Sequence, residues 1–330
     1  MTTPPIHLVT GAFGYSGRHI AAQLLARGET VRTLTGHPDR PDPFDGAVAV
    51  YPLDFEDPYG LQHALQGVTV LYNTFWIRFA RRGLDHEVAV AWTRRLFDAA
   101  AAAGVQRVVH VSITNPSLDS PLPYFRGKAE LERMLAGSGL SHAILRPAVL
   151  FGDRDVLINN IAWFLRHLPL FGVPGDGDYG IQPIHVEDLA RLAVEQGADR
   201  EDVTLDAVGP ETFSYEDLVR LVARHVAPGR PIVHVPRRLV IAVSRLLGSV
   251  LGDVVLTADE VDGLMADLLV SHGEPTGRVL LSEWLADHRD ELGVRYANEL
   301  RRHYLVAEER AGGAPGRTGA GNPRSAHQAS

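Results

Sequence analysis

The sequence contains no cysteine, and this absence removes several kinds of chemistry at once. Without thiols the chain cannot form disulfides, thiolate metal sites or a cysteine nucleophile. The chain also lacks a basic surplus, because 40 acidic side chains outnumber 32 Lys and Arg and give a formal net charge of -8. Nucleic-acid binding depends on clustered Lys and Arg, so we expect no nucleic-acid partner.

Signals for membrane insertion, secretion and metal binding are missing as well. The most apolar late stretch, residues 239–256, carries Arg245 and Asp253 and is short for a span, so we expect no integral membrane segment. We expect a buried or pocket-lining helix, with contact to a membrane surface as the less favoured alternative. The N-terminal residues show neither the basic region nor the long apolar core of a secretory signal. The fifteen histidines include no H-E-x-x-H or close ligand spacing, and His185 is interpreted as a helix-start residue. We therefore expect a cytoplasmic protein without a metal site.

What the sequence does contain is an alternation of short β-branched runs with amphipathic helical segments. This alternation predicts an α/β fold with a doubly wound parallel sheet. In a chain of 330 residues we expect a dinucleotide-binding core over 1–150, a smaller substrate lobe with returning core segments over 151–307, and a disordered tail over 308–330. The strands are predicted at 6–10, 30–34, 48–52, 68–73, 107–112 and 142–146, and the helices at 16–27, 59–65, 84–103, 125–136, 215–226, 258–269 and 281–292.

A glycine-rich loop follows the first predicted strand and precedes the first helix. In Thr10-Gly11-Ala12-Phe13-Gly14-Tyr15-Ser16-Gly17, the first glycine permits a tight turn, the second lets backbone approach a pyrophosphate, and the third lets the helix pack closely. Strand, glycine spacing and helix agree, so the loop predicts dinucleotide binding.

The end of the second strand bears on which dinucleotide is bound. An NAD enzyme usually has Asp or Glu there to bind the ribose 2′-hydroxyl, whereas here Arg32, His37 and Arg40 occupy this region without a carboxylate at the expected place. This pattern favours NADP(H), with NAD(H) as the alternative, although the same residues also suit a solvated surface. Asp54, after the third strand, is expected either near the adenine amino group or as a helix N-cap.

Three polar residues predict acid/base chemistry. Tyr124 and Lys128 are four residues apart on a predicted helix, so they share a face, and a nearby ammonium favours the phenolate. Ser112 ends an apolar strand, and in such sheets ligands bind at the carboxyl ends of the strands. Ser112, or Thr114 in its place, is predicted to orient a substrate oxygen while Tyr124 transfers the proton. The structural alternatives are an ordinary strand-end hydroxyl and an aromatic residue at a helix start.

Taken together, the loop, Ser112, Tyr124 and Lys128 resemble the extended and atypical branch of the short-chain dehydrogenase/reductase superfamily. The segments Leu145-Arg146-Pro147 and His185-Val186-Glu187-Asp188 resemble later motifs of this branch. Within it, the chain is similar to NAD(P)H-binding NmrA-like regulators, to a complex I accessory subunit and, more distantly, to NAD-dependent nucleotide-sugar epimerases and dehydratases. The resemblance implies Tyr124 as acid/base, Lys128 as its activator and ribose ligand, and Ser112 as the orienting hydroxyl. The predicted cofactor-binding residues are Gly11, Phe13, Gly14, Tyr15, Gly17, Arg32, Thr35, His37, Arg40, Asp54, Asn73, Lys128 and Pro147.

These observations favour an NAD(P)(H)-dependent oxidoreductase that acts on a small apolar carbonyl or alcohol. Phe75, Trp76, Trp163 and Phe164 suggest a hydrophobic pocket, and the bulk at the end of the fourth strand is unusual for the family. Two alternatives stay open: a non-catalytic NAD(P)H-binding sensor or assembly protein, and a sugar-nucleotide epimerase or dehydratase. The resemblance also implies a homodimer.

Overall fold

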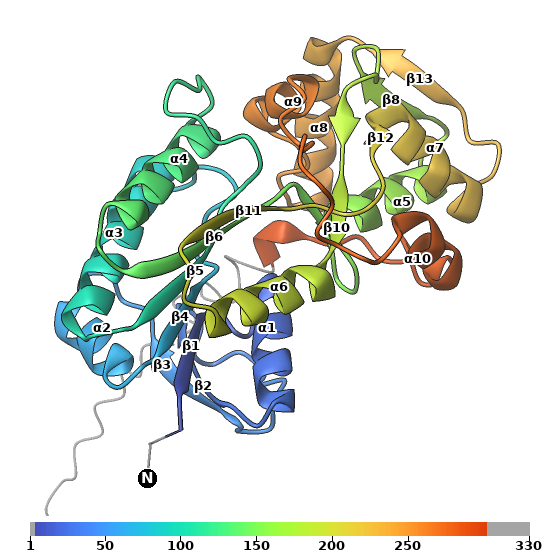
Figure 1. Ribbon diagram of the computed structural model, residues 1–330. Coiled ribbons are helices and arrows are strands. Elements are labelled where there is room, and N and C mark those ends of the chain that lie inside the picture. Colours follow the sequence, from blue (N-terminus) through green and yellow to red (C-terminus); the bar gives the residue numbers. More distant parts are fainter. Residues whose placement is uncertain (1–3, 302–330) are drawn as a thin grey trace, which may run out of the picture.

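Seven short strands form a parallel sheet in the order β11-β6-β5-β4-β1-β2-β3 (Figure 1). The computed structural model describes residues 4–301. The order reverses direction between β1 and β4, which is where such sheets place their ligand crevice. The strands are β1 (Ile6–Thr10), β2 (Thr30–Thr35), β3 (Val48–Pro52), β4 (Val70–Asn73), β5 (Arg107–Val111), β6 (Ser141–Pro147) and β11 (Val203–Ala207).

Helices cover both faces of this sheet, because its strands are apolar on both sides. α1 (Tyr15–Ala26) and α6 (Val186–Ala198) pack on one face, while α2 (Pro58–Leu65), α3 (His86–Ala102) and α4 (Pro123–Ala136) pack on the other (Figure 1). The predicted doubly wound α/β fold is confirmed, and each predicted core strand and helix lies within about two residues of its observed bounds.

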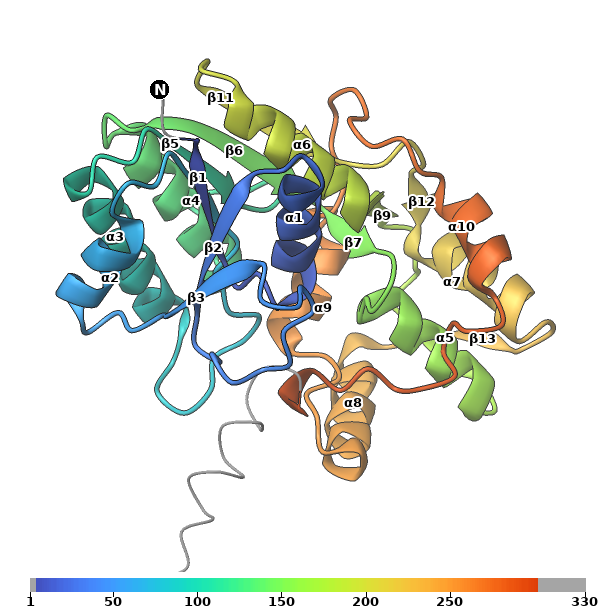
Figure 2. The same ribbon diagram turned by 90° about the horizontal axis from the view of Figure 1, so that it is seen from below.

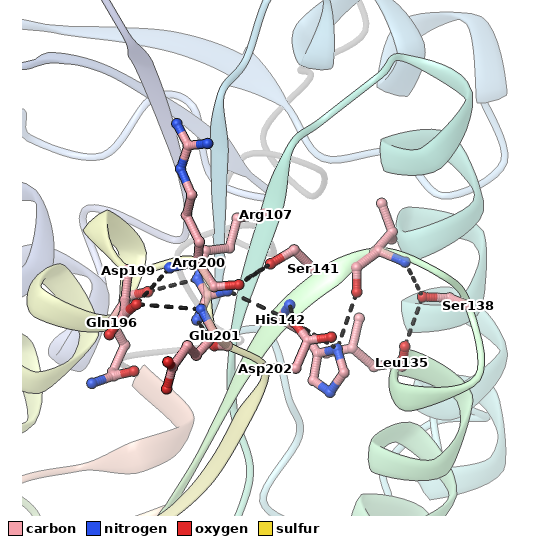
Figure 3. A network of polar contacts seen from close by, with 11 residues as sticks. Arg107, Leu135, Ser138, Ser141, His142, Gln196, Asp199, Arg200, Glu201 and Asp202 are labelled. Carbon is pink, nitrogen blue, oxygen red and sulfur yellow. Dashed lines mark hydrogen bonds and ion pairs between the residues drawn. The ribbon is translucent and has the colours of Figure 1, made fainter.

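Strand β11 joins the sheet although it comes late in the chain. Buried Arg107, at the start of β5, holds the turn that leads into it (Figure 3). Its guanidinium donates to the carbonyl oxygens of Gln196 and Glu201 and to the hydroxyl of Ser141, at 2.6–2.7 Å. The return of the chain to the sheet is therefore fixed by charge-assisted hydrogen bonds as well as by strand pairing.

The remaining elements form a lobe beyond the carboxyl end of the sheet, with its own apolar cluster (Figure 2). Its helices are α5 (Leu157–His167), α7 (Tyr215–Val226), α8 (Arg237–Leu251), α9 (Ala258–Met265) and α10 (Leu281–His288); its strands are β7 (Val149–Phe151), β8 (Phe171–Pro174), β9 (Gly180–Ile181), β10 (Pro183–His185), β12 (Phe213–Ser214) and β13 (Ile232–Val235). The tail predicted at 308–330 lies outside the described residues.

Two expectations about late helices have definite outcomes. His185 caps α6, since its side chain accepts a hydrogen bond from the backbone N–H of Glu187. The apolar stretch 239–256 was expected to be a buried or pocket-lining helix. Val255 and Leu256, beyond the end of α8, line a cavity, but the expectation is wrong for much of the helix itself, because α8 turns Leu246 and Val250 to solvent. Within residues 4–301, no helix is long and apolar enough to cross a membrane.

Candidate functional site

The glycine loop between β1 and α1 has the geometry that close backbone approach requires. Gly11 has φ +66°, which favours glycine, and its N–H donates to the Leu34 carbonyl oxygen at 2.8 Å. A Cβ atom built on Gly17 would lie 2.4 Å from the Gly11 carbonyl oxygen, so only glycine lets α1 pack against the loop. A Cβ on Gly14 would lie 3.0 Å from the same oxygen.

The start of α1 suits an anion. Its N-cap residue, Gly14, provides no side-chain cap, and the first turn contains no acidic residue. The orphan backbone N–H groups and the positive end of the helix dipole therefore face no competing carboxylate from the helix itself. A cradle of glycines at an uncapped helix N-terminus fits the diphosphate of a dinucleotide.

Residues in and just after β2 form different hydrogen bonds. Arg32 donates to the carbonyl oxygens of Ala64 and Gln66, at 3.1 and 2.8 Å, so its guanidinium is held at the end of α2. The Thr35 hydroxyl accepts the His37 N–H, and the His37 carbonyl accepts the Arg40 N–H, which makes a tight turn after β2. The engaged guanidinium of Arg32 is therefore less suited to a 2′-phosphate than its position in the sequence suggested.

Asp54 forms a local turn, since its carboxylate accepts the Glu56 N–H at 2.9 Å. The N-cap of α2 is Asp57, not Asp54. Two other predicted residues are buried: Phe13 packs against Phe44, and the Pro147 carbonyl oxygen accepts the Thr114 N–H at 3.0 Å.

Asn73, at the end of β4, is fully buried inside a polar network. Its side-chain oxygen accepts from the Thr10 hydroxyl and from the Phe75 N–H, and its amide nitrogen lies 3.0 Å from Nδ1 of His110. These bonds tie β4 to β1 and β5. The structure therefore gives Asn73 a structural role beneath the site.

Ser112 and Thr114 both have internal partners. The Ser112 hydroxyl donates to Glu132, whose carboxylate also pairs with Arg146, with Nε of Arg146 3.0 Å from Oε1. The Thr114 hydroxyl donates to the Leu268 carbonyl oxygen at 2.7 Å. Both hydroxyls thus stabilise the junction between α4, the sheet and the lobe, and neither is presented to a ligand in this arrangement.

Tyr124 and Lys128 share a face of α4, but an indole contacts both of them. The Lys128 ammonium donates to the Val111 carbonyl oxygen at 2.7 Å and lies 4.6 Å from the Trp76 ring centroid. Trp76 also meets Tyr124 edge-on, with centroids 5.7 Å apart. Gly127 makes room for the indole, since a Cβ there would lie 2.9 Å from Trp76 Cη2.

Burial dominates the ionisation of this pair. It raises the pKa of Tyr124 above its usual value, with a further increase from Glu260. It lowers the pKa of Lys128 to about 7, against a smaller opposing effect of Glu132. The expected activation of the phenol by the ammonium is therefore absent from this arrangement, and Tyr124 remains a neutral phenol near pH 7.

A cavity of about 790 Å³ lies between the sheet and the lobe. Tyr15, next to the glycine loop, Ile113 and Tyr124 line it from the core, and Phe164 and Leu264 line it from α5 and α9. Most of its surface is apolar. Of the aromatic residues expected in the pocket, only Phe164 lines it directly; Phe75 packs on Phe55, and Trp163 stacks on His167.

The cavity also holds polar groups that the sequence patterns did not reveal. Arg78 pairs with Glu260 and donates to the Val255 carbonyl oxygen at 3.0 Å. His86, at the start of α3, is buried beside Tyr124, with ring centroids 5.7 Å apart, and burial lowers its pKa. Only its position one residue after the helix cap Asp85 marks His86 in the sequence, and that signals a helix start, not a site.

Comparison with known proteins agrees with this geometry. Residues 11–162 match the family described as NAD(P)H-binding. The matched stretch begins at Gly11 of the glycine loop and ends within α5.

The relatives of this chain differ widely in the roles that their names describe. It is 25% identical over 276 residues to the mitochondrial NADH-ubiquinone oxidoreductase 40 kDa subunit of Neurospora crassa, covering 79% of this chain and 71% of that protein. It is 26% identical over 245 residues to the photosystem II assembly factor Ycf39 of Cyanidium caldarium, covering 73% and 78%. Its fold matches that of Citrobacter sp. triphenylmethane reductase complexed with NADP(H), with a TM-score of 0.68, 17% identity and coverage of 86% and 99%.

Proposed function

We propose that the protein is an NAD(P)H-dependent reductase, with NADPH preferred, that passes hydride to an apolar acceptor. The observation that carries this proposal is the continuity of the two halves of the site. Tyr15 directly follows Gly14 of the dinucleotide loop, and its side chain lines the large apolar cavity together with Tyr124. A ligand in the cavity therefore lies beside the dinucleotide cradle.

The state of Tyr124 supports the direction of reduction. A neutral phenol can donate a hydrogen bond to a carbonyl oxygen, whereas an alcohol oxidation needs a phenolate to accept a proton. Because burial raises the pKa of Tyr124, the phenolate is scarce at neutral pH. A bound dihydronicotinamide would supply the hydride. The chain orients the carbonyl acceptor, and Tyr124 polarises its oxygen and passes to it the proton that completes the alcohol.

The cavity favours apolar acceptors over sugar nucleotides. Its two arginines already have partners: Arg78 pairs with Glu260, and Arg126 donates to the Ser120 carbonyl oxygen at 3.0 Å. A substrate diphosphate would need cations without such commitments.

The test is turnover of NADPH with a panel of aldehydes, quinones and triphenylmethane dyes, for the natural chain and for Tyr124→Phe. For a carbonyl substrate we expect turnover to fall about 100-fold or more in the variant, with unchanged NADPH affinity. Full activity of the variant on such a substrate would refute the role of Tyr124.

Cofactor preference has its own test. Titration calorimetry with NADPH and NADH should show Arg40→Ala losing NADPH affinity about tenfold or more, with NADH little changed, because a charge-assisted bond to the 2′-phosphate is lost. Arg32→Ala is the matched control, since its guanidinium is bound to the carbonyl oxygens of α2. Equal losses for both cofactors would argue against NADPH preference.

A second function, dinucleotide binding without turnover, is favoured by one specific observation. Trp76 contacts both Tyr124 and Lys128, and the Ser112 hydroxyl is bound to Glu132, so the three expected catalytic groups do not converge. Tight NADPH binding with no oxidation across the whole panel would favour this function over the reductase.

A further inference from the structure

Helix α8 presents a continuous apolar ridge to solvent. Leu239, Val243, Leu246 and Val250 are 52, 44, 67 and 77% exposed. Their spacing of four, three and four residues places them on one face of the helix. A separate face, which includes Val240, Ile241 and Ser244, is buried against the lobe, so the ridge is not needed for folding.

The ridge is concentrated in one place on the molecule. Four of the ten large hydrophobic residues described as exposed belong to α8, which makes this helix the main apolar patch rather than one of several scattered positions. Figure 2 shows α8 at the outer edge of the lobe, away from the central sheet.

The charge of α8 is opposite to that of the chain. Residues 237–251 contain three arginines and no acidic residue, whereas the chain as a whole carries a net charge of -8. Arg237 is paired with Asp262, and Arg238 and Arg245 are exposed. On a helical wheel with 100° per residue, these two arginines lie together along one flank of the ridge.

We propose that α8 docks the protein on an anionic lipid bilayer. An apolar ridge with arginines beside it is the pattern of a helix that lies in the interface, with aliphatic side chains below the headgroups and cations on the phosphates. The net negative charge of the whole chain is repelled by an anionic surface, so the positive charge of α8 favours this side as the one that faces the membrane. A second copy fits less well, because two α8 ridges in contact would bring their arginines together without any acidic residue on the helix.

Docking would bring the cavity close to the bilayer. α8 ends at Leu251, and Val255, Leu256 and Thr257, a few residues further on, line the cavity. An acceptor dissolved in the membrane would then be near the site. This last link rests on the proposed reductase function, whereas lipid docking does not.

The experiment is flotation of the full chain with vesicles of phosphatidylcholine containing phosphatidylglycerol, and with vesicles of phosphatidylcholine alone. We expect binding to the anionic vesicles to exceed binding to the neutral ones at least tenfold, and to weaken as salt is raised. The double variants Leu246→Asn/Val250→Asn and Arg238→Gln/Arg245→Gln should each lose at least tenfold. Val294→Asn, which changes an exposed aliphatic residue outside α8, should bind as the natural chain does.

Since these residues are exposed, the variants should keep the thermal melting profile of the natural chain, and NADPH affinity serves as an independent check of the fold. No binding to anionic vesicles, or equal binding to both kinds, would overturn the proposal. So would a dimer in light scattering that the Leu246→Asn/Val250→Asn variant abolishes, because it would assign the ridge to a second copy. Vesicle binding without any NADPH turnover would leave the docking proposal standing while the reductase proposal fails.

Discussion

Lys128 is the only lysine in the sequence, and its titration tests the account of the site directly. It is 2% exposed, and burial lowers its pKa to about 7 from the ordinary 10.5. In a chain labelled with 13C at lysine Cε, NMR should give a single lysine resonance that shifts with a midpoint near pH 7. Because the buried ammonium also donates to the Val111 carbonyl oxygen, the resonance should belong to an ordered side chain.

The same shift predicts how stability depends on pH. The unfolded chain keeps this lysine protonated up to about pH 10.5, whereas the folded chain releases the proton near pH 7, so the unfolded state binds more protons in between and stability rises with pH. Each pH unit contributes about 1.4 kcal/mol, so between about pH 7.5 and 9.5 the gain is about 3 kcal/mol.

Lys128→Met removes this contribution while keeping an unbranched chain of similar volume. The free energy of unfolding of the natural chain, measured by guanidinium titration and expressed relative to the variant, should therefore rise by about 3 kcal/mol over that range. The comparison cancels the titration of the tyrosines and histidines that both chains share. A resonance that titrates near 10.5, or parallel pH profiles for the two chains, would show that burial does not lower the pKa of Lys128.

Three further changes test other parts of the structure. Gly17→Ala should lower NADPH affinity at least tenfold in calorimetry and lower the free energy of unfolding by about 1–3 kcal/mol, because the new Cβ atom meets the backbone of the loop. The control Gly273→Ala should change neither quantity. Glu132→Gln should lower the free energy of unfolding in urea by about 2–3 kcal/mol, because it leaves the partly exposed Arg146 guanidinium without its charged partner. A similar loss for Glu130→Gln would contradict this. Burial and the Lys128 charge lower the pKa of His110. The stability of the natural chain relative to His110→Gln should therefore fall as pH drops below 6.5. A difference in stability that stays constant with pH would count against a buried neutral imidazole.

The core of the fold was predictable because its signals are local. Each core strand is a short β-branched run bounded by turn residues, and β1 begins and ends at the predicted Ile6 and Thr10. The glycine loop was predictable for the same reason, since strand, glycines and helix follow one another in the sequence. Strand β11 was not predicted, because its place in the sheet depends on contacts of Arg107 with residues 89 and 94 positions away.

The polar part of the site was harder to predict, because partners distant in sequence decide what each side chain does. Arg32 has a side chain that could bind phosphate, but its N–H groups donate hydrogen bonds to carbonyl oxygens at the end of α2. Ser112 follows its strand where an orienting hydroxyl is expected, but Glu132 on α4 accepts the hydrogen bond of that hydroxyl. The outward face of α8 escaped prediction for the opposite reason: apolar content alone does not tell a buried helix from one whose second face is exposed.

The bulky side chain of Trp76 packs where Gly127 has no side chain. An indole at the end of β4 needs space on α4, and the absence of a side chain between Arg126 and Lys128 provides it, since a Cβ on Gly127 would lie 2.9 Å from the ring. The space that Gly127 opens lies between the tyrosine and the lysine of the motif, so the indole is placed against both. Four-residue spacing therefore brings a phenol and an ammonium to the same helix face, but in this structure both of them contact the indole that follows β4.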